Sequence, residues 1–411
     1  MKAVKIALAS LAILGPAREI FAQAAPFLNF VVSPQSLGIG GTTAAIASGN
    51  ALATVGNPAQ LGMFSLENTF NATSALWTNR SYAFAYGIPY RDESLYVLAA
   101  NVGFPLRFID SGNPFKASVG IGYSNLNFSF SSIILPGSGP ETDVSNSFTL
   151  GLGMDYFARV GVGYSLKFIN TSNSYLPVNQ PAQDLGAIVQ VPLSKLILGD
   201  DERQGNINGL VPSVAINFGY VMRNFGRYVY PPWIPLPTEA DLGWGVDFGI
   251  KSMVDGERLE WISFVWSEQA DDHPFHEDSI VASIYGTDTT WNHPTSYQKG
   301  LGSFGIWRNL VLDRGSQSVG IRKGGQIGLC EFLYLRAGAI TDASQTSYST
   351  FGWGLRLDGL AKCLVFFKWL NPNAPVARFL LDHIDLEYDY SKAYGCIYQG
   401  KPFEDLNVVV R

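Results

Sequence analysis

The chain of 411 residues is lightly charged and rich in glycine and aromatic side chains: 15% of its residues are charged, 13% are aromatic and 43 are glycines. This composition favours a strand-rich protein, and a formal net charge of −6 gives no electrostatic reason to bind nucleic acid. After the first 25 residues, no stretch reaches the roughly 18 uncharged apolar residues of a membrane-spanning helix. If the chain spans a membrane, it must therefore do so as a closed β-barrel.

The N-terminus has the features of an export signal. Two lysines precede an apolar stretch from Ile6 to Leu14, and Ala22 and Ala24 are the small residues that a signal peptidase recognises. We predict that residues 1–24 are a signal peptide cleaved after Ala24. Because charged residues at 18 and 19 make the signal irregular, an uncleaved anchor is the alternative.

The next segment, residues 25–66, consists mostly of glycine, alanine and other small residues with hardly a charge. Such a segment is suited to packing where space is tight. We expect it to form a plug inside a barrel built by residues 67–411.

The remainder of the chain repeats stretches of about ten residues in which large apolar side chains alternate with small or charged ones. In 158–168, for example, Val160, Val162 and Tyr164 alternate with glycine and serine. Strands of a soluble sandwich are typically about five residues long, whereas a tilted strand that crosses a bilayer needs about 9–11. The expected strands are 68–77, 80–90, 94–108, 116–131, 144–156, 158–169, 184–193, 211–222, 240–252, 257–267, 297–311, 325–338, 348–359, 380–391 and 402–410. Since bacterial single-chain barrels have even strand numbers, we predict an all-β transmembrane antiparallel barrel of about fourteen strands, one of these ranges belonging to the plug or a loop.

Successive side chains of a strand point to opposite faces, so the apolar set must face lipid and the polar set the lumen. A lysine or arginine on the lipid face near the membrane midplane costs about 2–4 kcal/mol. The charged residues predicted to face the lumen are Asp155, Lys167, Asp247, Lys251, Arg356, Asp358, Asp385, Glu387 and Asp389.

Turn length predicts the orientation of the barrel, because short turns face the periplasm and longer loops the exterior. Tight turns are expected just after Tyr156 and at Val254–Glu257. The segments 170–183, 223–239 and 268–296 then become extracellular loops, and 195–209 is an unusually long periplasmic connection.

Several motifs resemble the PorV/PorQ family within the wider FadL-type outer-membrane barrels. They comprise Leu37-Gly38-x-Gly40-Gly41 with the alanine-rich run after it, Asn57-Pro58-Ala59 followed by Leu61, Leu335-Arg336-Ala337-Gly338, Thr350-Phe351-Gly352-Trp353-Gly354-Leu355 and the closing strand from Phe403. The resemblance implies a fourteen-stranded barrel with an N-terminal hatch inside it. It places Asn57, Pro58 and Ala59 at the hatch turn, where proline fixes one backbone angle and Gly56 frees a neighbouring one. The sequence departs from the usual pattern at Val410 and Arg411, where such barrels end in an aromatic residue.

Enzymatic and cofactor functions are not indicated. The glycine run lacks the third glycine and the acidic partner of a dinucleotide-binding loop, and no nucleophile elbow is present. A cluster of carboxylates and histidines from Asp271 to Asp278 is interpreted as a solvated loop, and the three cysteines as small apolar residues. We expect no cofactor, no metal and no enzyme activity.

Three functions agree with these features. The first is a PorV-like component of type IX protein secretion, which the resemblance implies would bind the C-terminal signal domain of secreted cargo. A stiff aromatic loop offers a partner surface through Tyr228, Tyr230, Trp233 and Ile234. The second is a FadL-like, hatch-gated channel for hydrophobic solutes, with an apolar pocket beneath the loops. The third is a structural barrel; all three contact lipid in the outer membrane of a Gram-negative-type bacterium.

Overall fold

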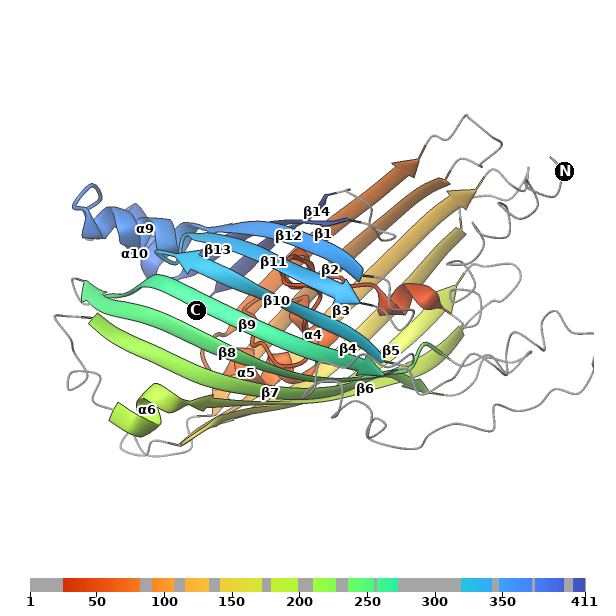
Figure 1. The fold of residues 1–411 in the computed structure, drawn as a ribbon, viewed down its shortest axis with the longest axis horizontal. Helices are drawn as coiled ribbons and strands as arrows, with labels where there is room; N and C mark the ends of the chain where they lie inside the picture. Colours follow the sequence, from red (N-terminus) through yellow and green to blue (C-terminus); the bar gives the residue numbers. More distant parts are fainter. Residues whose placement is uncertain are drawn as a thin grey trace, which may run out of the picture.

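The computed structural model shows a cylinder of antiparallel strands around a group of short helices (Figure 1). It describes residues 25–81, 91–106, 115–132, 141–171, 179–198, 210–226, 236–254, 257–272, 319–341, 347–371, 374–394 and 402–410. The predicted signal peptide lies outside the described residues, as do Tyr228, Tyr230, Trp233 and Ile234 of the predicted partner loop.

Fourteen strands form the barrel, and each pairs with its neighbour in sequence. The barrel closes where the first strand pairs with the last, so that Phe70 lies opposite Val102 on one side and Val410 on the other. The prediction of a fourteen-stranded transmembrane barrel is confirmed. The strands are β1 (Phe70–Ser81), β2 (Arg91–Leu106), β3 (Lys116–Ser132), β4 (Glu141–Asp155), β5 (Arg159–Thr171), β6 (Asn179–Pro192), β7 (Leu210–Gly226), β8 (Glu239–Val254), β9 (Glu257–Asp272), β10 (Val319–Leu329), β11 (Leu333–Thr341), β12 (Ser347–Arg356), β13 (Ile384–Tyr394) and β14 (Phe403–Val410).

The predicted strand 325–338 is wrong, and the predicted strand 380–391 begins only at Ile384, because residues 380–382 belong to a helix. Residues 325–338 were expected to form a single strand, but the chain turns at 330–332 and continues as β11. Cys330 and Glu331 both have a φ of 54°, a left-handed backbone that the alternating pattern does not signal. The predicted strand 297–311 and most of 80–90 lie outside the described residues.

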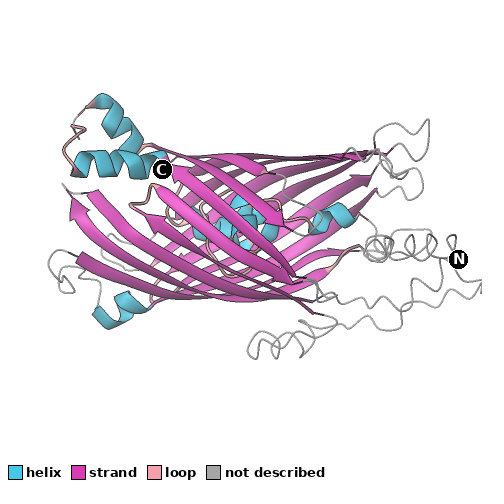
Figure 2. Ribbon diagram, turned by 45° about the horizontal axis from the view of Figure 1, so that its top comes forward, coloured by secondary structure: helices cyan, strands magenta, loops and turns pink. Residues whose placement is uncertain are grey.

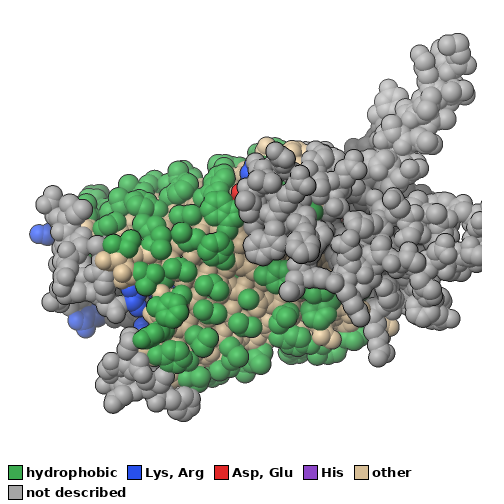
Figure 3. Space-filling view, turned by 60° about the horizontal axis from the view of Figure 1, so that its bottom comes forward, with side chains coloured by type: hydrophobic (Ala, Val, Ile, Leu, Met, Phe, Trp, Pro, Cys, Tyr) green, Lys and Arg blue, Asp and Glu red, His purple; other side chains and the backbone are tan. Residues whose placement is uncertain are grey.

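The outer wall is apolar, as a lipid-facing surface must be. Along β4 the side chains of Phe148, Leu150 and Leu152 are exposed, while Thr149 and Gly151 between them are buried in the interior. Figure 3 shows hydrophobic side chains over much of the coloured surface of the cylinder, with several lysine and arginine side chains near one end. We call the end that carries the connections after β1, β3, β5, β7, β9, β11 and β13 the loop end, and the opposite end the turn end. The three segments predicted to be extracellular follow β5, β7 and β9, so they lie at the loop end.

The interior holds the N-terminal segment as four short helices: η1 (Pro26–Asn29), α3 (Pro34–Gly38), α4 (Ala53–Gly56) and α5 (Ala59–Ser65) (Figure 2). Helix α3 begins at Pro34, whose fixed φ suits a first helical position, and Ser33 caps it by accepting a hydrogen bond from the Ser36 amide at 3.3 Å. Helix α5 packs against β3, β4 and β5, and α3 against β12 and β13.

Helices at the turn end were not anticipated. The predicted strand 348–359 ends at Arg356, and helix α9 (Leu357–Phe366) follows it, paired with α10 (Pro375–Asp382). A third helix, α6 (Leu193–Leu198), starts the connection that was expected to be long and periplasmic. Among the described residues, no helix has the length and apolar character needed to cross a membrane.

Candidate functional site

The hatch turn at Asn57–Ala59 is held by its own asparagine. The Asn57 side chain donates a hydrogen bond to the Ala44 carbonyl at 2.8 Å and accepts one from the Ala59 amide at 3.0 Å. Both bonds are fully buried, so this residue joins two parts of the hatch and fixes the start of α5. The predicted hatch residues Gly56, Asn57, Pro58, Ala59 and Leu61 are all buried within the barrel.

The glycine run of the hatch contacts the opposite part of the wall. Gly40 and Gly41 both have a φ of 75°, which residues with a side chain rarely adopt. The Gly40 amide donates to the Thr350 hydroxyl at 3.0 Å, and that hydroxyl donates to the Gly38 carbonyl at 3.2 Å. The run therefore ties the hatch to β12.

Two further sets of hydrogen bonds fix the hatch from other directions. On β9, the Gln269 side chain accepts from the amides of Thr43 and Ala44 at 2.8 and 2.9 Å. Near the barrel closure, Asn50 donates to Asp405 of β14 at 2.9 Å, and the Ala51 amide donates to Thr73 of β1 at 3.1 Å. The hatch is thus anchored on three sides of the bore.

Toward the loop end, the interior wall carries apolar side chains on β13, β14, β1, β2, β3, β5 and β6. This surface, which we call the apolar chamber, is formed by Ala75, Trp77, Leu95, Val97, Ala99, Leu126, Phe128, Ile169, Ala182, Ala393 and Phe403. All of them alternate with lipid-facing residues, so they point inward. An apolar interior is unusual, because the lumen of an outer-membrane barrel is normally polar.

The hatch's own first residues fill the apolar chamber. Phe27, Leu28, Val31 and Val32 are buried against it, and the ring of Phe30 lies edge-on to Phe128 at 5.2 Å between centroids. Burying such a side chain contributes about 1.5–3 kcal/mol. A short stretch around η1 therefore covers the apolar chamber from within the barrel.

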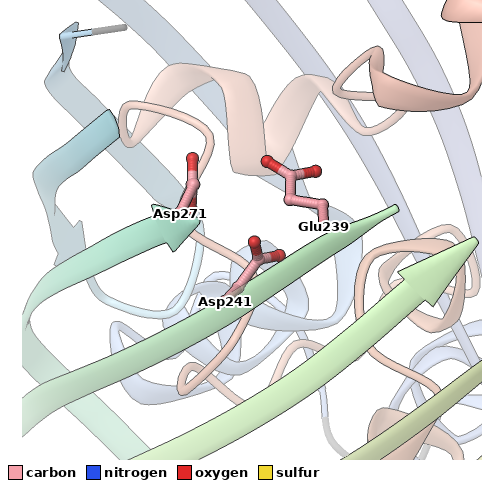
Figure 4. A group of neighbouring side chains, drawn as sticks. All are labelled: Glu239, Asp241 and Asp271. Carbon is pink, nitrogen blue, oxygen red and sulfur yellow. The ribbon is translucent and has the colours of Figure 1, made fainter. Parts of the chain in front are cut away.

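The facing part of the wall at the loop end carries a buried ion-pair network. Glu239 and Asp241 of β8 and Asp271 of β9 converge, with one carboxylate oxygen of each within 4.8 Å of the others (Figure 4). Arg223 lies 2.8 Å from Asp241 and also pairs with Glu239; Arg322 lies 3.2 Å from Glu239 and also pairs with Asp271. The geometry of three carboxylates suits a hard cation, but two guanidinium groups already bind these oxygens. The network joins β7, β8, β9 and β10 across the interior.

The placement of Asp271 corrects the interpretation of Asp271–Asp278 as a solvated loop. Asp271 is an inward-facing, buried residue of β9, and residues 273–278 lie outside the described part of the chain.

Between the hatch and the turn end lies a polar cavity of about 720 Å³. The hatch contributes Thr43, Ser48 and Gln60, and the wall contributes charged residues from several strands. Of the predicted lumen residues, Asp155, Asp247, Lys251, Arg356 and Glu387 line this cavity.

The remaining predicted lumen residues have other positions. Lys167 is buried toward the loop end, where it pairs with Asp184 at 2.7 Å. On β13, Asp385 pairs with Arg356 and Asp389 with Arg336. Asp358 is not on a strand as expected; it lies in the first turn of α9, because the alternating pattern gives way to helical spacing after Leu357.

Sequence reasoning missed the residues that hold the interior together, above all Arg223, Arg322, Arg336 and Gln269. Arg336 was recognised only as part of the Leu335–Gly338 motif. Because it follows the apolar, lipid-facing Leu335 in the strand, the alternation of side chains also predicts that it points inward. The apolar chamber also had a signal, since Leu95, Val97 and their exposed neighbours make a strand that is hydrophobic on both faces.

Comparison with known proteins yields distant similarities. Neither protein-family models nor curated proteins match this sequence. Among solved structures, a deletion mutant of the TodX monoaromatic hydrocarbon channel is 11% identical, with 92% of this chain and 97% of that chain covered and a TM-score of 0.42. The β domain of the Bordetella autotransporter BrkA (9% identity, 84% and 98% covered, TM-score 0.32) and the transport unit of the autotransporter AIDA-I from Escherichia coli (6% identity, 87% and 97% covered, TM-score 0.31) are also similar. The closed cylinder and its apolar outer wall define the class: a transmembrane β-barrel with an internal hatch.

Proposed function

We propose that this protein is a hatch-gated channel that takes small hydrophobic solutes across the outer membrane. The observation that carries the proposal is the apolar chamber at the loop end, an inward-facing surface that a channel for polar solutes would not use. In the described structure it is covered by Phe27, Leu28, Val31 and Val32. A solute that displaced this stretch would find the same apolar contacts.

The order of compartments along the bore suits directional release. A hydrophobic solute would enter the apolar chamber from the loop end, pass the hatch, and reach the polar cavity of about 720 Å³ at the turn end. Its affinity would fall along this route, because charged side chains such as Lys251 and Glu260 join apolar ones in the lining of the cavity, whereas the apolar chamber is lined by apolar side chains. Passage requires the hatch to move, since it occupies the bore between the two compartments.

The PorV-like role in protein secretion, which the motifs implied, stays a prediction. Its partner loop lies outside the described residues, and no contact within the described ranges bears on binding of a secreted protein. The channel proposal has a structural feature behind it, and we therefore place it first.

A disulfide between the hatch and the wall tests the proposal. A Cβ built on Gly243 of β8 lies 3.4 Å from the Cβ of Ala45 in the hatch, close to the roughly 3.5–4.5 Å of natural disulfides. The variant A45C/G243C, made with the three native cysteines replaced by serine, is reconstituted in vesicles. Uptake of a radiolabelled uncharged aromatic hydrocarbon is measured after oxidation and again after reduction.

We expect the oxidised lock to abolish protein-dependent uptake and reduction to restore it. The single variants A45C and G243C, treated in the same way, are the matched controls for the substitutions and for the oxidant. Equal uptake by the locked and the reduced protein would refute gating by the hatch, and an absence of uptake even after reduction would refute the channel.

A further inference from the structure

The connection between β12 and β13 folds into a helical hairpin that projects at the turn end of the barrel (Figures 1 and 2). We call α9, α10 and the residues between them the α9–α10 hairpin. None of its described residues belongs to the hatch or lines the apolar chamber, so the proposed channel leaves it without a role.

One face of the hairpin is firmly docked. Ala361 and Val365 of α9 pack with Leu381 of α10, and all three are buried. Lys362 forms an ion pair at 2.5 Å with Glu331 in the β10–β11 turn, and the Cys363 thiol donates to the Cys330 carbonyl at 3.4 Å. Burial raises the pKa of the Cys363 thiol to about 12. The polar contacts of the hairpin therefore face the barrel.

The opposite face of the hairpin presents large apolar side chains to its surroundings. Trp369 is 78% exposed, Phe367 53% and Phe379 51%, and the backbone of Lys368 between the first two has a positive φ of 61°. Soluble surfaces rarely expose contiguous aromatic patches unless they bind something apolar. The docked polar face and the exposed aromatic face together make the hairpin amphipathic.

The aromatic face continues the lipid-facing wall of the barrel. The ring of Phe366 lies 4.5 Å from Trp261 of β9, Phe367 lies 5.2 Å from Phe366, and Trp369 lies 5.6 Å from Phe367, all between ring centroids. Trp261 is the extra residue of a β-bulge, and its indole donates at 2.8 Å to Ser252 of β8, which alternates with the cavity-lining Lys251 and therefore faces outward. This unbroken series of rings leads from the bilayer-facing strands onto the hairpin.

Other elements at the turn end share this character. Leu196 and Ile197 of α6 are 52% and 78% exposed, and Tyr156 and Phe157 in the β4–β5 turn are 50% and 66% exposed. Apolar and aromatic residues thus stand at several points around the same rim, at the level where outer-membrane barrels carry an aromatic girdle.

We propose that the α9–α10 hairpin is a membrane-interface anchor, whose aromatic face lies in the boundary between headgroups and acyl chains of the leaflet at the turn end. Tryptophan and phenylalanine favour that depth, and exposed Lys368 is placed to reach phospholipid phosphates. The occupant of the aromatic face is phospholipid, because the face is continuous with a wall that lipid already covers.

Spin labelling tests the anchor. The native cysteines are replaced by serine, and a nitroxide is attached to full-length protein at W369C, at F379C or at R378C. Arg378 is the matched control, since it is the exposed neighbour of Phe379 on α10 but is turned by about 100° around the helix. Collision rates with oxygen, which concentrates in lipid, and with a water-soluble nickel complex are measured in vesicles of phosphatidylethanolamine and phosphatidylglycerol.

We expect labels at 369 and 379 to collide several-fold more with oxygen, relative to nickel, than the label at 378. Low oxygen-to-nickel ratios at 369 and 379, no higher than that at 378, would place the hairpin in water and overturn the proposal. Spin–spin coupling between copies, with both reagents excluded from 369, would also overturn it, because a second protein would then occupy the face. All labelled positions are exposed, and heat-modifiable gel mobility verifies that each variant is folded.

Discussion

Individual buried charged residues join the strands and the hatch inside this barrel. Arg336 of β11 has no exposed side-chain surface, pairs with Asp389, lies 3.6 Å from Glu387 and donates to Gln326 at 2.6 Å. Its side chain also touches the hatch, since a Cβ built on Gly38 would lie 3.1 Å from it. One residue thus links three strands and the hatch.

We expect R336Q to lower the free energy of unfolding by about 3–5 kcal/mol, because it leaves the carboxylate of Asp389 buried without its partner. The matched control is K251Q, which removes an ion pair of 3.5 Å to Glu260 whose side chains are 26% and 21% exposed. That change should cost about 1 kcal/mol or less. Urea unfolding in lipid vesicles, followed by gel mobility, measures both, and similar losses would contradict the assigned role of Arg336.

At the level of single residues, the alternating pattern could place side chains inside but could not choose their partners. Lys167 was expected in the lumen and lies there, yet its partner Asp184 comes from the next strand and required the register. Asp358 was assigned to a strand in error, because an alternation with a period of two residues does not show where a strand ends and a helix begins.

Contacts between elements depend on close approach of the hatch to the wall. Helix α5 lies against β4 and β5, and at Gly163 the wall has no room for a side chain: a Cβ there would lie 2.1 Å from the carbonyl oxygen of Pro58. A glycine at this position is therefore a packing requirement of the hatch turn.

G163A should force the turn at Pro58 away from β5 and lower stability by about 1–3 kcal/mol, the usual cost of overpacking. G49A is its matched control, because nothing lies within 4 Å of a Cβ at Gly49 and that change should leave stability nearly unaltered. Thermal unfolding in vesicles compares the two variants. Equal melting temperatures would show that the hatch turn adjusts freely.

The sequence predicted the strands of the barrel better than the helices at its turn end. The barrel strands were found because period-two alternation is sustained over long stretches, as in β4 and β5. The α9–α10 hairpin was missed because Leu357–Phe366 and Pro375–Asp382 are both too short to show a helical period clearly beside strands. The apolar chamber was expected only as a pocket beneath the loops, and its lining could not be assigned without knowing which strands face η1.

The whole molecule is a cylinder whose bore is filled by its own N-terminal segment. Without residues 25–66, the inward-facing glycines and the other interior surfaces that this segment covers would line an open bore. The hatch, and not the diameter of the barrel wall, therefore limits the passage through the protein.

Deletion of residues 25–66, with the export signal retained, should convert a nearly non-conducting barrel into one with steady ohmic conductance in planar bilayers. Full-length protein in the same bilayers is the control, and heat-modifiable mobility verifies that the deletion variant is folded. A folded variant without added conductance would mean that the wall collapses inward when the hatch is absent.

The hydrogen bonds at Asn50 and Ala51 have a consequence for biogenesis. They reach Asp405 on the last strand and Thr73 on the first, and Thr73 itself donates to Asn407 across the same seam at 2.8 Å. The pairing of the final strand with the first and the packing of the N-terminal segment in the bore thus depend on the same polar groups. We therefore expect that closure of the sheet between its last and first strands also positions the N-terminal segment in the bore.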